Sequence, residues 1–141
     1  MDGTGKRDAD SVNTVCGFRR LTVWKRSKDL AVKIYKVCRE GPLAKDFSLR
    51  DQIQRSAVSV CSNIAEGDER ESDRDSVRFF LIAKGSLAEL ATQVEIASEI
   101  GYFSAIVASD FLLECREIAR MIGGLVKARS GGVLTRQRSI P

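Results

Sequence analysis

Apolar residues recur with a helical period along the chain, most clearly over residues 72–101. At 100° per residue, the apolar side chains of this stretch fall on one broad face. Ser72 and Asp75 indicate a capping box at its start, because the serine oxygen can accept a hydrogen bond from a free backbone N–H and the acid favours the positive helix end. Gly101 ends it, since a left-handed residue costs least at glycine. A helix of about 40 Å cannot bury its apolar face alone, so other helices must cover it.

Two further helices are predicted before this one. The first runs over residues 23–40, with Thr22 as its N-cap and the Gly41–Pro42 pair as its end. The second runs over residues 48–66 and is opened by a second capping box, Ser48 with Asp51. Short connections join each helix to the next, which predicts antiparallel neighbours.

A fourth helix is predicted over residues 104–127. It contains Gly123 and Gly124, which would each weaken a helix by roughly 1 kcal/mol relative to alanine, so we expect a close contact or a bend there. No alternating pattern indicates a strand. The predicted fold class is therefore all-α, an antiparallel up-and-down four-helix bundle.

The two ends of the chain lack this periodicity. Residues 1–17 are polar and aperiodic, which predicts a disordered N-terminal arm. Residues 130–141 are rich in glycine and basic side chains, which predicts a flexible basic tail. The bundle domain is accordingly expected over residues 18–129.

Composition is ordinary for a soluble globular chain, with 43% hydrophobic and 30% charged residues. No apolar run approaches the roughly 20 residues that cross a bilayer, and the first residues lack the apolar core of a secretory signal. We therefore expect a cytoplasmic protein that does not associate with a membrane. The net charge of +4 is compatible with nucleic-acid binding without requiring it.

The most useful fact about chemistry is that the sequence contains no histidine. Histidine-based triads, general bases and metal ligands are thereby excluded. The four cysteines are scattered without zinc-site spacing. The helix-borne carboxylates Glu66, Glu89 and Glu95 have no partner base or phosphate-binding loop beside them. We expect no enzymatic activity, no metal, no cofactor and no small-molecule substrate.

Six basic residues gather on one arc of the first predicted helix. They are Lys25, Arg26, Lys28, Lys33, Lys36 and Arg39. One interpretation is an ordinary solvated face of a bundle helix. The other is a surface that follows a phosphate backbone, because lysine and arginine gain affinity there by releasing counterions.

A polar strip of short side chains covers one half of the second predicted helix and extends to the third. Its members are Arg55, Ser59, Ser62, Asn63, Glu66, Gly85 and Glu89. We interpret it as a seam of hydrogen-bonded contacts between helices or between subunits. A ligand or nucleic-acid groove and a plain solvent face remain the alternatives.

Several short motifs resemble one bacterial family. Residues 54–60 (QRSAVSV), 62–67 (SNIAEG) and 85–90 (GSLAEL), with the aromatic stretch before Lys25 and Gly101–Tyr102, are similar to the 23S rRNA intervening-sequence proteins over about residues 18–129. Cys61 departs from the pattern, since relatives often carry proline there, and we expect a less kinked second helix.

The resemblance implies a four-helix bundle that assembles as a ring-like homo-oligomer, typically a pentamer, with no known enzymatic activity. A relative that serves retroelement reverse transcriptases uses such a ring to bind nucleic acid. Our first hypothesis is therefore a homo-oligomeric scaffold with weak, sequence-independent binding to RNA or DNA. The alternative is an interaction module that docks an acidic or co-encoded protein partner.

Overall fold

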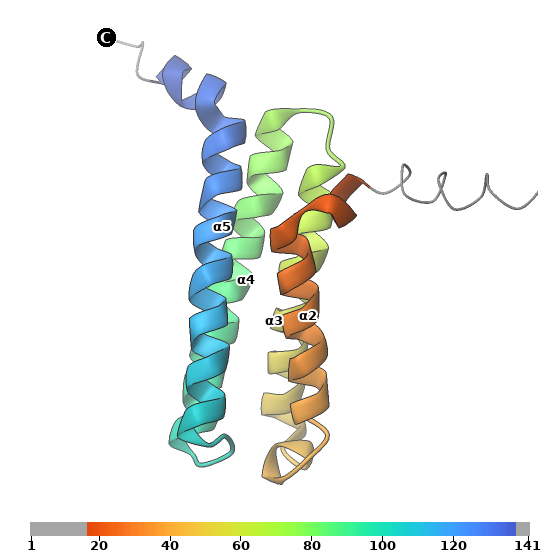
Figure 1. Cartoon of the computed structure of the whole chain (residues 1–141), viewed down its shortest axis with the longest axis vertical. Coiled ribbons are helices and arrows are strands. Elements are labelled where there is room, and N and C mark those ends of the chain that lie inside the picture. Colours follow the sequence, from red (N-terminus) through yellow and green to blue (C-terminus); the bar gives the residue numbers. More distant parts are fainter. Residues whose placement is uncertain (1–16, 138–141) are drawn as a thin grey trace, which may run out of the picture.

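Four helices pack side by side in an up-and-down bundle (Figure 1). The computed structural model describes residues 17–137, with side chains up to residue 131, and contains no strand within that range. In chain order the helices are α2 (Thr22–Val37), α3 (Phe47–Asp68), α4 (Asp73–Glu99) and α5 (Ala105–Gln137). Two short 3-10 turns, η1 (Gly17–Arg20) and η2 (Pro42–Ala44), precede α2 and α3. The predicted all-α fold class is confirmed.

The helices follow one another around the bundle. The main contacts join α2 to α3, α3 to α4, and α4 to α5, and α5 returns to α2. The helices α2 and α4 therefore lie on a diagonal and run in the same direction. Both end at the lower end of the bundle in Figure 1.

The starts of the helices agree only partly with the predicted caps. Ser72 caps α4 as predicted, with its hydroxyl oxygen 3.2 Å from the N–H of Asp75. Thr22 is not the cap of α2, because the helix already includes it and Leu21 holds the cap position without a side-chain bond. The prediction for α3 is also wrong, since that helix begins before Ser48.

Asp46 caps α3 in place of the predicted serine. Its carboxylate accepts a hydrogen bond from the N–H of Leu49 at 3.2 Å and another from the hydroxyl of Tyr102 at 2.9 Å. This hydrogen bond, together with partial burial, raises the pKa of Tyr102. One carboxylate thus joins the start of α3 to the turn between α4 and α5. From there α3 continues without a break through Cys61 to Asp68.

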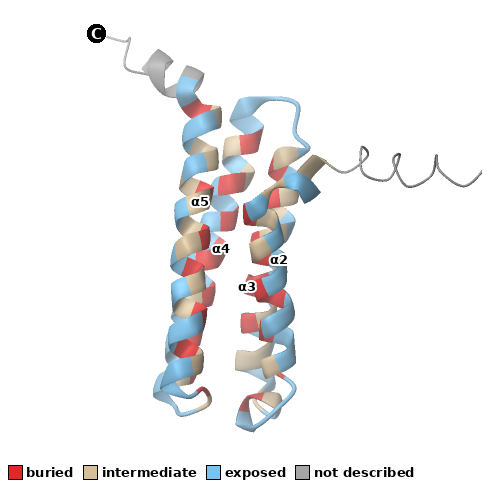
Figure 2. Ribbon diagram, in the orientation of Figure 1, coloured by how far each residue is buried: buried red, intermediate tan, exposed pale blue. Residues whose placement is uncertain are grey.

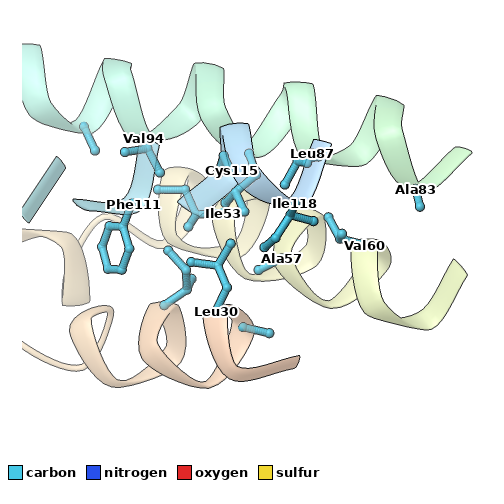
Figure 3. Close-up of a cluster of buried hydrophobic side chains, with 14 of the residues drawn as sticks. Leu30, Ile53, Ala57, Val60, Ala83, Leu87, Val94, Phe111, Cys115 and Ile118 are labelled. Atoms are coloured by element: carbon cyan, nitrogen blue, oxygen red, sulfur yellow. The ribbon is translucent and has the colours of Figure 1, made fainter. Parts of the chain in front are cut away.

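The core occupies the space between all four helices, and the buried positions form a continuous inner stripe on each one (Figure 2). Side chains from the four helices interdigitate there (Figure 3). The largest fully buried apolar side chains are Phe80, Ile34, Leu43, Ile53, Ile64, Leu90, Ile118 and Ile122. Truncation of such a residue to alanine costs roughly 2–5 kcal/mol, so the bundle is held mainly by this core.

A close approach between α3 and α4 occurs at Gly67, near the end of α3. A methyl group at this position would lie 2.6 Å from a ring carbon of Phe80 and 3.1 Å from the carbonyl oxygen of Ser76. Only glycine leaves room for this aromatic ring. Gly67 is the last residue of the motif at residues 62–67, so this part of the motif is explained by packing.

The last helix differs from its prediction in two respects. It extends to Gln137, so residues 130–137 continue α5 where the sequence predicted a tail. Of the two expectations at Gly123 and Gly124, the close contact is absent within the described chain, because a methyl group at either would meet nothing within 4 Å, and the bend stays a prediction. The predicted N-terminal arm up to residue 16 and the end of the predicted tail, 138–141, lie outside the described residues.

Candidate nucleic-acid and subunit interfaces

The outer side of α2 carries most of the predicted basic arc. Its exposed members are Lys25, Lys28, Lys33, Lys36 and Arg39. They follow one another over about four helical turns and point away from the core stripe that contains Leu30 and Ile34. This placement suits electrostatic contact with an extended chain of negative charges.

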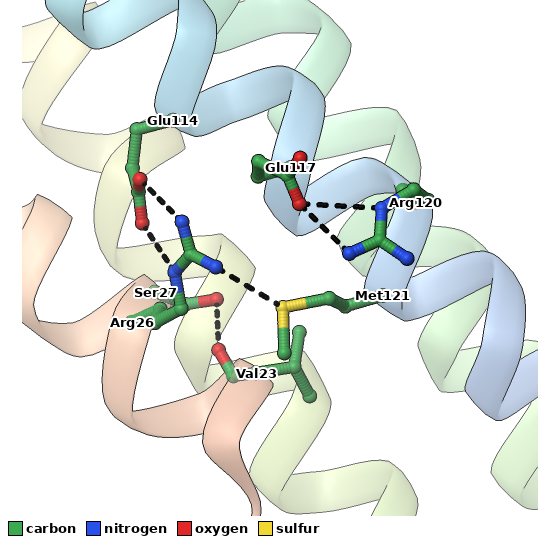
Figure 4. A network of polar contacts seen from close by, with 7 residues as sticks. All are labelled: Val23, Arg26, Ser27, Glu114, Glu117, Arg120 and Met121. Atoms are coloured by element: carbon green, nitrogen blue, oxygen red, sulfur yellow. Dashed lines mark hydrogen bonds and ion pairs between the residues drawn. The ribbon is translucent and has the colours of Figure 1, made fainter.

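Arg26 is placed differently from the other five bases. It is half-buried and forms a two-pronged ion pair with Glu114 of α5, with Nε 2.8 Å from Oε1 and Nη2 2.7 Å from Oε2 (Figure 4). A third guanidinium nitrogen lies 3.8 Å from the sulfur of Met121. The hydrogen bond between the pair raises the pKa of Arg26 and lowers the pKa of Glu114. Arg26 therefore joins α2 to α5, and its charge is already neutralised within the bundle.

The basic face is also interrupted by other side chains. Asp29 forms an ion pair with Lys28 at 2.8 Å, and this neighbouring ammonium lowers the pKa of the carboxyl group. The ammonium of Lys28 also lies 5.9 Å from the ring centre of Trp24. Val32 and Tyr35 stand exposed between the bases. The face is thus a mixture of positive charge and apolar surface.

Two grooves flank α2, one on each side. The groove between α2 and α3, of about 400 Å³, is lined by Lys28, Ala31, Val32, Tyr35, Lys36, Arg39, Val58 and Cys61. The groove between α2 and α5, of about 520 Å³, is lined by Leu30, Lys33, Lys36, Val37, Val107, Asp110, Phe111 and Glu114. Both have apolar floors. The first has only bases at its rim, whereas the second has both signs of charge.

The polar strip on α3 is divided between inward and outward residues. Ser59 faces α4, where its hydroxyl lies 2.8 Å from the hydroxyl of Ser86. Asn63 donates to the carbonyl of Ser59 at 2.8 Å and to its hydroxyl at 3.0 Å. This part of the strip is a seam between helices. Ser86 was missed in the sequence, although it lies inside the motif at residues 85–90.

The remaining members of the strip are exposed in the single chain: Arg55, Ser62, Glu66, Gly85 and Glu89. Glu66 forms an ion pair with Arg70 one turn later. Nothing lies within 4 Å of the place where Gly85 would carry a methyl group. Contacts between subunits at these positions stay a prediction.

A second carboxylate, that of Asp68, connects η1, α3 and α5 at the end of the bundle where α3 ends. It was not singled out from the sequence. The side chain of Asp68 is only 6% exposed and receives Arg20 of η1 at 3.4 Å and Arg129 of α5 at 3.5 Å. Arg129 also lies 3.4 Å from Asp73 at the start of α4. No pattern of local spacing announces this junction, because its members are far apart in the chain.

Candidate chemistry is sparse among the described residues. No group of three histidine, cysteine or carboxylate side chains in residues 17–137 could hold a metal ion. Burial raises the pKa of Cys115 to about 12, and burial also raises the pKa of Cys38 and Cys61. These thiols are neutral at physiological pH and are poor nucleophiles. No described helix is both long enough and apolar enough to cross a membrane.

Comparisons with known proteins agree with the motifs. Residues 19–124 match the model of the 23S rRNA-intervening sequence protein family. No curated protein matches the chain. A solved structure from Bacteroides thetaiotaomicron, described as a protein with unknown function from the S23 ribosomal protein family, is 25% identical, with a TM-score of 0.69. The match covers 75% of this chain and 99% of that one.

Proposed function

Because the chain belongs to the 23S rRNA-intervening sequence protein family, we propose that it is a non-enzymatic, homo-oligomeric bundle that binds RNA or DNA weakly and without sequence preference. The outer face of α2 is the proposed contact surface. The number of subunits, five, is part of the proposal and rests on the family resemblance alone.

One observation supports nucleic-acid binding above all others. Five basic side chains project from a single helix face, and within it Lys25, Lys33 and Lys36 have no ion pair among the described contacts. Ammonium groups that are not paired within the protein can replace counterions along a phosphate backbone. Since the face has no arrangement that reads base edges, binding without sequence preference is expected.

The test is a gel-retardation or anisotropy assay with a short labelled RNA of mixed sequence and the matching DNA. If three lysines contact phosphates of a single strand, the affinity falls roughly twentyfold between about 50 and 200 mM salt. The double variant Lys25→Glu with Lys33→Glu should abolish binding at low salt. The control, Arg74→Glu with Lys127→Glu, makes the same change in net charge on exposed residues of α4 and α5 and should retain binding.

Equal binding by the two double variants would contradict the assignment to α2. Absence of retardation for the unmodified chain at low salt would remove nucleic-acid binding altogether.

A second candidate function is supported by Val32 and Tyr35, which are 45% and 40% exposed among the bases. Apolar side chains within a charged rim are typical of contacts between proteins. On this candidate, α2 docks an acidic surface of a protein partner. Capture of a co-encoded protein that survives nuclease treatment favours it, and loss of the captured protein with nuclease favours nucleic acid.

A further inference from the structure

Two groups of exposed apolar side chains lie on different helices of the bundle. The first, which we call the α2–α3 face, consists of Val32, Tyr35 and Val58 above the groove between those helices. Its charged rim consists of Lys28, Lys36 and Arg39, and no carboxylate lines the groove. The α2–α3 face is therefore apolar in the middle and positive at its edge.

The second surface, which we call the α4 face, is the outer side of α4. Its large exposed apolar residues are Leu81, Ile82, Ile96 and Ile100, between 42% and 53% exposed. Gly85, Ala88 and Thr92 lie between them at helical spacing. Their short side chains leave room in the middle of the face for close approach by another helix.

The charge of the α4 face is opposite to that of the α2–α3 face. Glu89 and Glu99 are exposed along the second half of α4, and Glu95 lies with Lys84 beside the groove between α4 and α5. The chain contains no lysine or arginine from residue 85 to residue 115. The preceding base, Lys84, lies beside the groove between α4 and α5. The second half of α4 is therefore apolar and negative.

We propose that these two faces are the two halves of one contact, formed between successive copies of this chain. The α2–α3 face of one copy receives the α4 face of the next. Because the faces differ and carry opposite charge, the contact is head-to-tail rather than a two-fold contact of one face with itself, and it propagates until a ring closes. This inference rests on the homo-oligomer of the proposed function and identifies its surfaces.

The spacing along the two helices supports this pairing. Since α2 and α4 run in the same direction, two copies that stand parallel bring the helices together in parallel. Tyr35 follows Lys28 by seven residues, and Ile96 follows Glu89 by seven. Lys28 and Tyr35 are about 10 Å apart along the axis, and Glu89 and Ile96 are equally far apart. Arg39 and Ile100 both lie just past the ends of their helices.

In this alignment each group meets a suitable partner. Lys28 lies opposite Glu89, Tyr35 opposite Ile96, and Arg39 opposite the end of α4 with Glu99. Exposed apolar patches of this kind mark association sites in soluble proteins, and the paired charges fix the register and exclude the like-charged alternative.

The contact also divides the basic face of α2. Lys28, Lys36 and Arg39 belong to the subunit contact, whereas Lys25 and Lys33 do not line that groove and remain free for phosphates. Their repetition in each subunit would place phosphate contacts at regular intervals around the ring.

The experiment uses one substitution in each face, made in the full chain: Tyr35→Asp and Ile96→Asp. Molar mass is measured by light scattering for each variant alone and for an equimolar mixture, and circular dichroism checks that each remains helical. The control, Leu113→Asp, replaces an exposed apolar residue of α5 outside both faces.

Each variant alone should have the mass of one chain, and the control should assemble like the unmodified protein. The mixture should have the mass of two chains, because it contains one intact α2–α3 face and one intact α4 face. Assembly of Tyr35→Asp alone, or a mixture that stays at the mass of one chain, would overturn the head-to-tail contact while the homo-oligomer stands. A single-chain mass for the unmodified protein would overturn both.

A charge exchange gives an independent readout with smaller changes. Arg39→Glu and Glu99→Lys should each weaken assembly several-fold through like-charge contact. The variant that carries both should recover assembly, because the pair is restored with its signs reversed. No recovery would contradict the proposed register.

Discussion

The seam between α3 and α4 differs from the seam between α2 and α5 in how closely the helices approach. Between α3 and α4, the ring of Phe80 lies against Gly67, and the hydroxyls of Ser59 and Ser86 meet directly. Between α2 and α5 there is an open groove of about 520 Å³. Short side chains permit the first arrangement, whereas the second groove is lined by larger apolar side chains and by charges of both signs.

This difference separates stability from partner binding. The α3–α4 seam is closed where Gly67 meets Phe80, and Ser59 and Ser86 satisfy each other farther along it. Those two serines also line a groove of about 340 Å³, where the Oε1 of Gln93 has no hydrogen-bond partner among the described residues. The α2–α5 seam is bridged by the ion pair of Arg26 with Glu114, and it leaves apolar groove floor and lysines accessible. We therefore expect substitutions in the closed seam to act on folding and those on the outer face of α2 to act on binding.

The largest expected effect is that of Phe80→Ala, which removes a fully buried ring from the closed seam. The loss in free energy of unfolding should be about 3–5 kcal/mol. Phe111→Ala should cost less, because one side of that ring borders the open groove and little new cavity forms. Urea unfolding measures both, and equal losses would contradict the contrast between the seams.

Gly67→Ala should cause the next largest loss in free energy of unfolding. Its new methyl group meets Phe80 and the backbone of Ser76, and the resulting overpacking should cost about 1–3 kcal/mol. The matched change Gly124→Ala has open space around it and should stabilise α5 by up to about 1 kcal/mol. Changes of the same sign in thermal unfolding would refute the assignment of Gly67 to close packing.

Removal of either hydroxyl of the Ser59–Ser86 pair should cause a smaller loss in free energy of unfolding. Ser59→Ala or Ser86→Ala alone should cost about 1 kcal/mol, because each leaves a partly buried hydroxyl without this partner. The double variant should cost less than the sum of the two. Strict additivity in the double-mutant cycle would mean that the hydroxyls do not interact in solution.

The smallest effect should come from the ion pair across the open seam. Arg26 lowers the folded-state pKa of Glu114, so the pair stabilises the bundle fully above the ordinary carboxyl pKa and loses this contribution as pH falls through the folded-state pKa. Solvent screening limits the contribution to about 1 kcal/mol or less.

The measurement is unfolding free energy against pH for the unmodified chain and for Glu114→Gln. The difference between the two curves should shrink below the ordinary carboxyl range. A constant difference down to strongly acid pH would show that the ion pair contributes nothing that depends on ionisation.

Much of the fold was predictable because it depends on local periodicity. Helix positions, the Ser72 cap and the antiparallel order follow from spacing within single segments. The capping of α3 by Asp46 was missed, since serine at residue 48 offers an equally good local signal and Tyr102 supports Asp46 from a distant turn. The extension of α5 was missed because its glycines suggest an end.

The candidate sites were predictable as faces but not as contacts. The spacing put Arg26 with the other bases, yet Glu114 draws it inward from another helix, and one sequence does not show that pairing. In the same way the polar strip was found without the knowledge that Ser59 faces Ser86. The exposed apolar residues of α4 could not be separated from its core residues in the sequence, because both sets lie side by side on the same helix.

Light scattering on protein purified at low salt, combined with its absorbance ratio, tests the central claim most directly. The account predicts a mass that is a multiple of one chain and a nucleic-acid contribution to absorbance that is removed by high salt. A mass of one chain with the absorbance of pure protein would contradict it.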